Sequence, residues 1–472
     1  MKTLRVIRMA MANLRPFRMI TVITVFAPLG FTANVYAKLD VGLSSSNYLG
    51  QGEVGRKDNQ SALDLLLDTK SESPGLGLDT RVLIQAEIGF SDSSYRFIEF
   101  PDLYVATSKA MTGPYQASLG RRLTAWSAID DTWGTGTFQP RFRWDYLRPQ
   151  EVGLLGLYQE LKTGPVKVTV FYSPIYIPDR GAPIDFADGR IRSTSPWTVN
   201  PPYSTEIERK TVPVRYDAVI PPTSEIIRQN TIATSVSVGE AEGLWSTVSY
   251  AYKPMNELLM SYEGYLSTAL NNGDAHATLY PRVGYHHVAS LDVGTHGKWM
   301  SATISGTADH PTDRAPIVHD RVSQQVGNMY LLSPTFTVNP FGDARGGSAS
   351  LSYLRVFGRD PPDVGNSADP ATLADGVSSE FDSRYPFKSA FMLSAALPPW
   401  HRFTVDFRLL YDVQDPGTIV SWMFTYAPER KWKLFFATDV LSSFTGDSAD
   451  GTDFIHRYRE NDRATGGVTY VF

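Results

Sequence analysis

The chain has 472 residues, of which 42% are hydrophobic and 12% are aromatic, and it contains no cysteine. A chain without cysteine cannot form disulfides, Cys-ligated zinc sites or iron–sulfur clusters, and it cannot use a thiol nucleophile. Its 44 basic and 49 acidic residues give a formal net charge of −5. Because no basic run follows the N-terminal segment, we expect no nucleic-acid partner.

The N-terminus has the features of an export signal. Residues 1–18 carry five basic side chains and no acidic one, and residues 19–31 (MITVITVFAPLGF) form a short apolar stretch. A proline and a glycine interrupt that stretch, which also falls short of the ~20 residues that a membrane-spanning helix needs. Residues 35–37 (Val-Tyr-Ala) then fit the small-x-small pattern of a cleavage site. The sequence therefore predicts a signal peptide over residues 1–37.

Segments that alternate between apolar and polar residues recur along the rest of the chain. Residues 401–412 (HRFTVDFRLLYD) alternate in this way, and residues 81–90 (RVLIQAEIGF) have one continuously apolar set. A period of two places the two sets on opposite faces of a strand. The segments approach the ~9–11 residues of a tilted membrane strand, and aromatic residues gather near their ends. The pattern predicts an all-β fold, a transmembrane antiparallel β-barrel over residues 79–472.

We expect about 18 strands, an even number as bacterial single-chain barrels require, within a range of about 16 to 20. The candidates are 79–90, 95–105, 115–122, 152–161, 166–173, 229–238, 243–252, 259–268, 274–281, 283–293, 298–307, 328–338, 347–358, 388–397, 401–412, 417–426, 431–441 and 460–472. Long connections, such as 123–151 and 174–228, then fall at one end and short turns at the other. The proline-rich connection 174–228 is either a lid over the lumen or a tolerated surface loop. The strand count is even only if residues 274–293 are divided into two strands at Pro281.

Residues 38–78 precede the first strand of this count. Leucines at helical spacing predict a short helix over residues 61–68. We interpret the segment as a periplasmic lead-in or a plug for the lumen, with a docking element for a periplasmic partner as the sharper alternative. An extra strand over residues 39–46 is a further alternative.

The connection over residues 121–151 is the candidate constriction, because we expect this loop to fold inward. A barrel of about 18 strands encloses a water-filled lumen. Arginines that face acids across such a lumen select charged or sugar-like solutes. The candidate residues are Arg121, Arg122, Trp126, Asp130, Asp131, Trp133, Arg141, Arg143 and Trp144, with Arg81, Arg402 and Arg408 on the polar faces of the wall. The alternatives are an interaction loop on the outer surface and simple packing of a long loop.

The chain ends on its own candidate strand. Gly466, Val468, Tyr470 and Phe472 share one face, and Phe472 is the last residue. This ending resembles the C-terminal targeting strand of Gram-negative outer-membrane proteins. The resemblance implies that these four residues form an assembly signal.

As a whole, the chain after the predicted signal peptide resembles the porin-type barrels of Gram-negative outer membranes. Residues 119–127 (LGRRLTAWS) look like the porin habit of ending a strand with Leu-Gly-Arg before an inward loop. Length and strand number also resemble the 18-stranded polysaccharide-export barrels of the alginate-export kind. The resemblance implies an integral, multi-pass protein of the outer membrane of a Gram-negative bacterium.

We therefore expect a channel that passes hydrophilic, sugar-like or anionic molecules, with exopolysaccharide export favoured. The alternatives are a solute-uptake porin and a non-conducting surface or adhesion barrel. Expected partners are outer-membrane lipid and lipopolysaccharide, the barrel assembly machinery and a periplasmic polysaccharide-export partner. No G-x-S-x-G, H-E-x-x-H or Walker motif occurs, so we expect neither an enzyme nor a cofactor or metal site.

Overall fold

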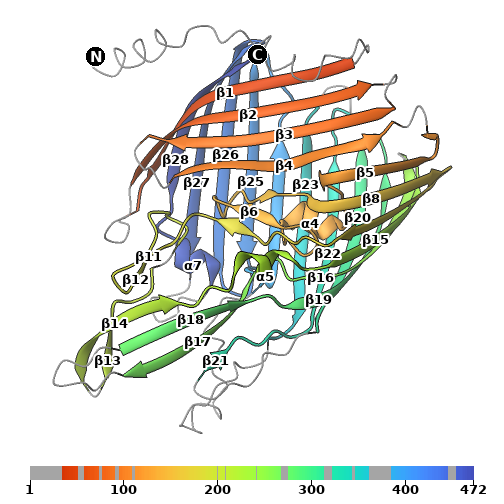
Figure 1. Ribbon diagram of the computed structural model, residues 1–472. Coiled ribbons are helices and arrows are strands. Elements are labelled where there is room, and N and C mark those ends of the chain that lie inside the picture. Colours follow the sequence, from red (N-terminus) through yellow and green to blue (C-terminus); the bar gives the residue numbers. More distant parts are fainter. Residues whose placement is uncertain are drawn as a thin grey trace, which may run out of the picture.

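Eighteen strands close into one antiparallel barrel in the computed structural model (Figure 1). The structure describes residues 34–50, 58–73, 77–90, 95–108, 112–198, 200–207, 209–240, 242–266, 275–312, 321–342, 346–360, 384–444 and 453–472. The barrel strands are β1 (Asn34–Tyr48), β2 (Asn59–Ser73), β3 (Leu78–Gly89), β4 (Arg96–Thr107), β5 (Tyr115–Arg122), β8 (Leu154–Thr163), β9 (Val166–Ser173), β15 (Thr231–Gly239), β16 (Gly243–Pro254), β19 (Tyr285–His296), β20 (Met300–Pro311), β22 (Met329–Val338), β23 (Ser348–Gly358), β24 (Ser389–Ala396), β25 (Phe403–Asp412), β26 (Gly417–Glu429), β27 (Trp432–Ser443) and β28 (Arg463–Val471).

The barrel closes where the last strand meets the first. β28 pairs antiparallel with β1, with Tyr470 opposite Val41. Beyond β28, the Phe472 amide donates to the carbonyl of Leu39 at 2.9 Å. Closure leaves the sheet without a free edge, which is the condition for placing strands in hydrocarbon. The predicted fold class, an all-β antiparallel barrel of about 18 strands, is confirmed.

The two faces of the wall differ as the alternation predicts. On β20, Ser305 and Thr307 face the interior and are buried, whereas Ile304, the residue before Ser305, faces outward and is 62% exposed. An outward apolar face on a closed barrel is stable only in lipid, so the protein is an outer-membrane β-barrel. Within the described ranges, no helix is both long and apolar enough to cross a membrane.

The predicted strand number is correct, but two of its members are wrong. Candidates 259–268 and 274–281 form β17 (Leu259–Leu266) and β18 (Ala275–Arg282), which lie outside the barrel sheet. β17 and β18 lie between the paired strands β16 and β19 in the chain, and they extend that antiparallel pair beyond the end of the barrel. Because they form a paired sheet there too, their residues alternate as those of barrel strands do. Two strands were wrongly included and two others were missed, so the predicted number of strands stayed at an even 18.

The two strands that replace them in the barrel are β1 and β2. The interpretation of residues 38–78 as a lead-in, plug or docking segment is therefore wrong, whereas the alternative of an extra strand over residues 39–46 is confirmed as part of β1. The residues of the helix predicted over 61–68 form part of β2. Asp64 and Asp68 lie four residues apart, a spacing that fits one face of a helix and equally one face of a strand. The pairing with β3 decides for the strand, with Asp64 opposite Glu87.

Long connections and short turns lie at opposite ends of the barrel. One end has tight turns, such as residues 164–165 between β8 and β9. The other end carries the additional elements β10 (Arg180–Gly181), β11 (Asp185–Ala187), β12 (Arg190–Arg192), β13 (Ser204–Ile207), β14 (Lys210–Ala218), α5 (Thr223–Ile227), β21 (Val322–Ser323) and α7 (Phe454–Tyr458). There, β13, β14, β18, β17 and β21 form a five-stranded sheet, at the lower left in Figure 1 and far from the C-terminus. Because outer loops are longer than periplasmic turns, this end is the extracellular one.

The signal peptide stays a prediction. Residues 1–33 lie outside the described residues, and β1 begins at Asn34, before the cleavage site expected after Ala37. The pairing that closes the barrel starts at Asp40, opposite Val471, so closure does not need the residues that cleavage would remove.

Candidate functional site

The connection between β5 and β8 folds into the barrel, as predicted. It contains α4 (Ala128–Trp133), β6 (Arg141–Arg143) and β7 (Gln150–Glu151), and Figure 1 shows α4 within the barrel outline. We call residues 123–153 the inward loop. The Ser127 hydroxyl caps α4 by accepting from the Ile129 amide, and Gly134 ends the helix in the left-handed region at φ 58°.

Asp130 organises the inward loop from within. Its carboxylate accepts from the amides of Thr137 at 3.0 Å and Phe138 at 2.7 Å, which draws the chain after α4 back onto the helix. Its side chain is 3% exposed, so this predicted constriction residue faces the loop and not open water.

The first anchor of the inward loop is the wall formed by β19, β20, β22 and β23. The Ser127 hydroxyl lies 3.2 Å from that of Thr307, and the Ala128 amide donates to Asp292 at 3.1 Å. Trp133 donates its indole N–H to the hydroxyls of Ser333 and Ser352 at 3.0 and 3.1 Å. This tryptophan, predicted from its loop position, therefore holds the loop against the wall.

The second anchor is an ion-pair cluster on β27 and β28. Arg148 donates both terminal nitrogens to the buried carboxylate of Asp439, at 2.8 and 2.7 Å. Arg463 donates to the same carboxylate at 2.7 Å and to Asp145 at 2.5 Å. The predicted wall residue Arg408 donates to the loop carbonyl of Leu147 at 3.4 Å, so it lies inside the barrel and faces the loop.

The third anchor lies against β4 and the connections that follow β9 and β16. Trp144 packs edge-on against Tyr95 with ring centroids 5.6 Å apart, and tilted against Phe97 at 4.9 Å. Arg141 lies 3.2 Å from the carboxylate of Asp179, and Arg143 lies 2.6 Å from that of Glu257. Through the three anchors the inward loop is tied to widely separated parts of the wall.

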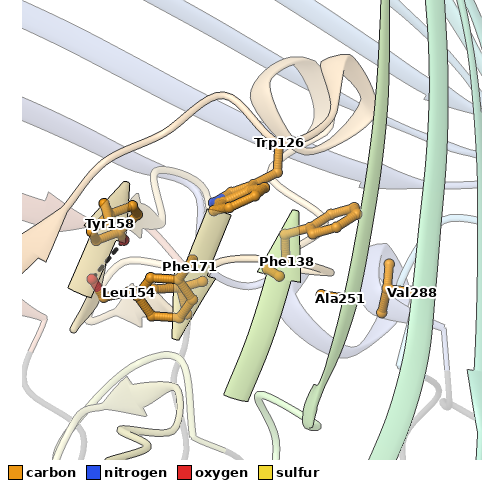
Figure 2. Close-up of a cluster of buried hydrophobic side chains, with 8 residues drawn as sticks. Trp126, Phe138, Leu154, Tyr158, Phe171, Ala251 and Val288 are labelled. Atoms are coloured by element: carbon orange, nitrogen blue, oxygen red, sulfur yellow. Dashed lines mark hydrogen bonds between the residues drawn. The ribbon is translucent and has the colours of Figure 1, made fainter. Parts of the chain in front are cut away.

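A buried aromatic cluster fixes the root of the loop (Figure 2). Trp126 stacks on Phe138 with centroids 6.1 Å and planes 6° apart, and its edge meets Phe171 at 6.4 Å. Trp126 is 1% exposed, so it packs as a core residue and offers no face to a solute. Tyr158 completes the cluster and donates to the Leu154 carbonyl at 2.7 Å.

The remaining predicted arginines of the strands are paired with acids. Arg121 lies 2.7 Å from Glu99 and Arg122 lies 2.8 Å from Glu160, while Arg81 bonds to Asp68 and lies 3.2 Å from Asp102. The acids that neutralise these arginines were not predicted as partners, because they stand on other strands.

Arg402 differs from the expectation. It lies in the turn before β25, which begins at Phe403, and its guanidinium donates to the carbonyl of Pro428. The alternation of residues 401–412 continues into this turn, which is why the sequence placed Arg402 on the wall. Its position at the end with short turns puts it outside the lumen at the level of the loop.

The inner wall of β1–β3 keeps solvent contact, whereas the wall of β19–β23 is buried where the inward loop lies against it. Ser290 and Ser352 on the far wall are buried behind the inward loop, whereas Asp64 and Glu87 remain partly exposed. Glu87 stands opposite Asp64 in the register of β2 and β3. Among the described residues, neither Asp64 nor Glu87 forms an ion pair with a basic side chain.

The inward loop adds further carboxyl groups to the lumen. The side chain of Asp131 is exposed to lumen water, yet enclosure by the barrel and the neighbouring charges of Asp130 and Asp292 raise its pKa to about 7. Burial and the charges of Asp130 and Asp131 raise the pKa of Glu151 to about 8. No group of three or more His, Asp or Glu side chains within the described part of the chain could hold a metal ion.

The C-terminal residues lie as the sequence placed them. Tyr470 packs edge-on against Trp432 with centroids 4.8 Å apart, and against Phe472 at 4.6 Å. Gly466 and Val468 precede them on β28 with the same period of two. The role of these four residues as an assembly signal stays a prediction.

No family model matches this chain, and no curated protein matches it. Similar solved structures are bacterial porins. Pseudomonas aeruginosa OccK2 (OpdF) is 11% identical, with 93% of this chain and 97% of that chain covered and a TM-score of 0.49. Pseudomonas aeruginosa OccK9 (OpdG) is 12% identical, with 93% of this chain and 97% of that chain covered and a TM-score of 0.47. The OmpF of a Salmonella typhi OmpF complex with daunomycin is 9% identical, with 93% of this chain and 97% of that chain covered and a TM-score of 0.42. Similarities at this level carry no argument about what the chain transports.

Proposed function

We propose that this protein is an outer-membrane channel for the uptake of small hydrophilic solutes. The observation that carries the proposal is the inward loop, which is tied to three separate parts of the wall. A water-filled barrel of this strand number would otherwise have a wide lumen. A fixed loop across it leaves room for small molecules and sets an upper limit on their size.

The anchoring favours uptake of small solutes over export of a polymer. Arg148 and Arg463 share the carboxylate of Asp439, whose side chain has no solvent exposure. Removing one member of a buried ion pair typically costs about 3–5 kcal/mol, so displacing the loop to admit a polysaccharide chain would be expensive. Exopolysaccharide export, which the sequence favoured, has no such support, and the uptake alternative fits the geometry better.

The distribution of charge supports neutral or cationic solutes over anions. The arginines on which an anion preference would rest, such as Arg122 and Arg143, form ion pairs with acids. Among the described residues, Asp64, Glu87 and Asp131 form no ion pair with a base, and on the basic side Arg408 and Lys433 form none with an acid. A pore whose uncompensated charges are negative concentrates cations.

Planar-bilayer recording and liposome swelling test the proposal together. We expect a stable conductance, a reversal potential in a potassium chloride gradient that reports cation preference, and swelling with monosaccharides but not with long oligosaccharides. A barrel that never conducts would favour the surface or adhesion alternative. Free passage of long oligosaccharides, together with loss of surface polysaccharide in a deletion strain, would favour export.

A further inference from the structure

One charged residue interrupts the lipid-facing surface of three adjacent strands. The sequences of β22, β23 and β24 contain a single charged side chain, Arg355. On β23, Leu354 and Val356 are buried in a core cluster inside the barrel with Met329 of β22. The period of two then directs Arg355 outward, together with Phe357, which is 49% exposed.

Arg355 lies near the outer leaflet side of the membrane. It is three residues from the end of β23 at Gly358, and this end of the strand carries the long connections. At ~3.3 Å per residue the side chain starts about 10 Å from the end of the strand. Phosphate groups of outer-leaflet lipids are within reach of an arginine at this depth, because long basic side chains extend toward the interface.

The surroundings of Arg355 are apolar, and its charge lacks an acidic partner among the described residues. The guanidinium lies over the ring of Phe357, with its carbon 5.7 Å from the centroid. Its neighbours in register are Leu332 and Ser389, and the Ser389 hydroxyl is 3.1 Å from the hydroxyl of Tyr353. An ionised residue on a lipid face is costly unless an anion meets it there.

We propose that Arg355 binds a phosphate group of a phosphorylated glycolipid in the outer leaflet. The planar guanidinium can donate two parallel hydrogen bonds to phosphate oxygens, while the ring of Phe357 holds its orientation. The exposed side chains of Leu332 and Tyr330 then offer apolar contact to the acyl chains of the same lipid. The side chain faces the membrane, so a membrane-embedded phosphorylated glycolipid is the ligand and free phosphate is not. The proposal is independent of what passes through the lumen.

Binding of purified lipid A to the detergent-solubilised protein tests this site. We expect Arg355→Gln to weaken binding of bis-phosphorylated lipid A about tenfold, the usual size of a lost charge-assisted hydrogen bond. Arg190→Gln is the matched control, because Arg190 also lies over an aromatic ring, that of Tyr203, but stands in an extracellular excursion. The control should bind like the unaltered protein, and inorganic phosphate should not compete.

A second measurement needs no variant. The unaltered protein should bind dephosphorylated lipid A about tenfold more weakly than the phosphorylated lipid. Equal affinity for the two lipids, or equal affinity of Arg355→Gln and the unaltered protein for the phosphorylated one, would overturn the proposal. Conductance of Arg355→Gln in bilayers should stay unchanged, which separates this result from any failure of the proposed channel.

Discussion

The inner wall of this barrel has two regions that differ in what covers them. Along β19–β27 the inward loop lies against the wall, and polar side chains of the wall such as Asp292 and Asp439 accept hydrogen bonds from the loop. Along β1–β3 the wall is partly exposed, and the carboxyl groups of Asp64 and Glu87 form no ion pair with a described basic side chain. The abundance of arginine in the loop therefore does not set the sign of the net charge that lines the lumen. What matters is which charges remain uncompensated where water has access.

Removing the inward loop should change the conductance of the channel more than any other change. Replacing residues 124–150 with a short Gly-Ser linker should raise single-channel conductance severalfold, because the covered and open regions of the wall would then both line the lumen. The size limit in liposome swelling should disappear in the same variant. Heat-modifiable gel mobility controls for a folded barrel. A folded variant with unchanged conductance would show that the loop does not restrict flow.

Loosening one anchor should have a smaller effect than removing the loop. Asp439→Asn removes the carboxylate that Arg148 and Arg463 share. The free energy of unfolding should fall by about 3 kcal/mol, because the buried guanidinium of Arg463 loses its counter-charge, whereas the exposed side chain of Arg148 can turn to water. Urea unfolding followed by tryptophan fluorescence measures this, with the exposed Asp217→Asn as control. Equal stability of both variants would argue that the cluster does not hold the loop.

Removing the acidic groups from the partly exposed wall of β1–β3 should change the ion selectivity of the channel without changing the fold. At pH 9, we expect Asp64→Asn combined with Glu87→Gln to reduce the cation preference in a salt gradient several-fold, because the open wall loses two carboxylates. The same substitution at Asp217, on the extracellular sheet, should leave the reversal potential where it was. If the double variant matches the unaltered protein, the permeation path runs elsewhere.

The smallest effect should be a dependence of selectivity on pH. The pKa values of about 7 for Asp131 and about 8 for Glu151 lie above the ordinary carboxyl range. Both groups are therefore ionised at high pH and take up protons as the pH falls through these values. Cation preference should decline between pH 9 and pH 6, and Asp131→Asn should flatten that decline. A flat profile in the unaltered protein would mean that neither carboxyl group faces the path.

Much of the barrel could be predicted because a period of two is local to each strand. The segments at β25 and β28 alternate strongly enough to be recognised without tertiary information. β2 was misassigned because its leucines and its Asp64 and Asp68 fit a helix as well as a strand, and only pairing with β3 separates the two. A hairpin that continues past the rim, as β17 and β18 do, carries the same pattern as one that stays within it.

The candidate site could be predicted only in part, for a physical reason. The loop's position follows from its length and its place after β5, but the fate of each arginine depends on its partner. Arg148 and Asp439 are 291 residues apart in the chain, so the sequence does not reveal that one neutralises the other. Trp126 was predicted as a constriction residue because it lies in the inward loop, yet it packs in the core.

The central claim is that water and solutes pass along β1–β3 and are excluded from the wall behind the inward loop. The chain has no native cysteine, so single cysteines can be introduced without background. Ser44 lies on the partly exposed wall of β1 and Ser290 on the buried wall of β19. A charged, membrane-impermeant thiol reagent should reduce the current at once through Ser44→Cys and should leave Ser290→Cys unaffected. Rapid block of Ser290→Cys with no effect at Ser44→Cys would contradict the account.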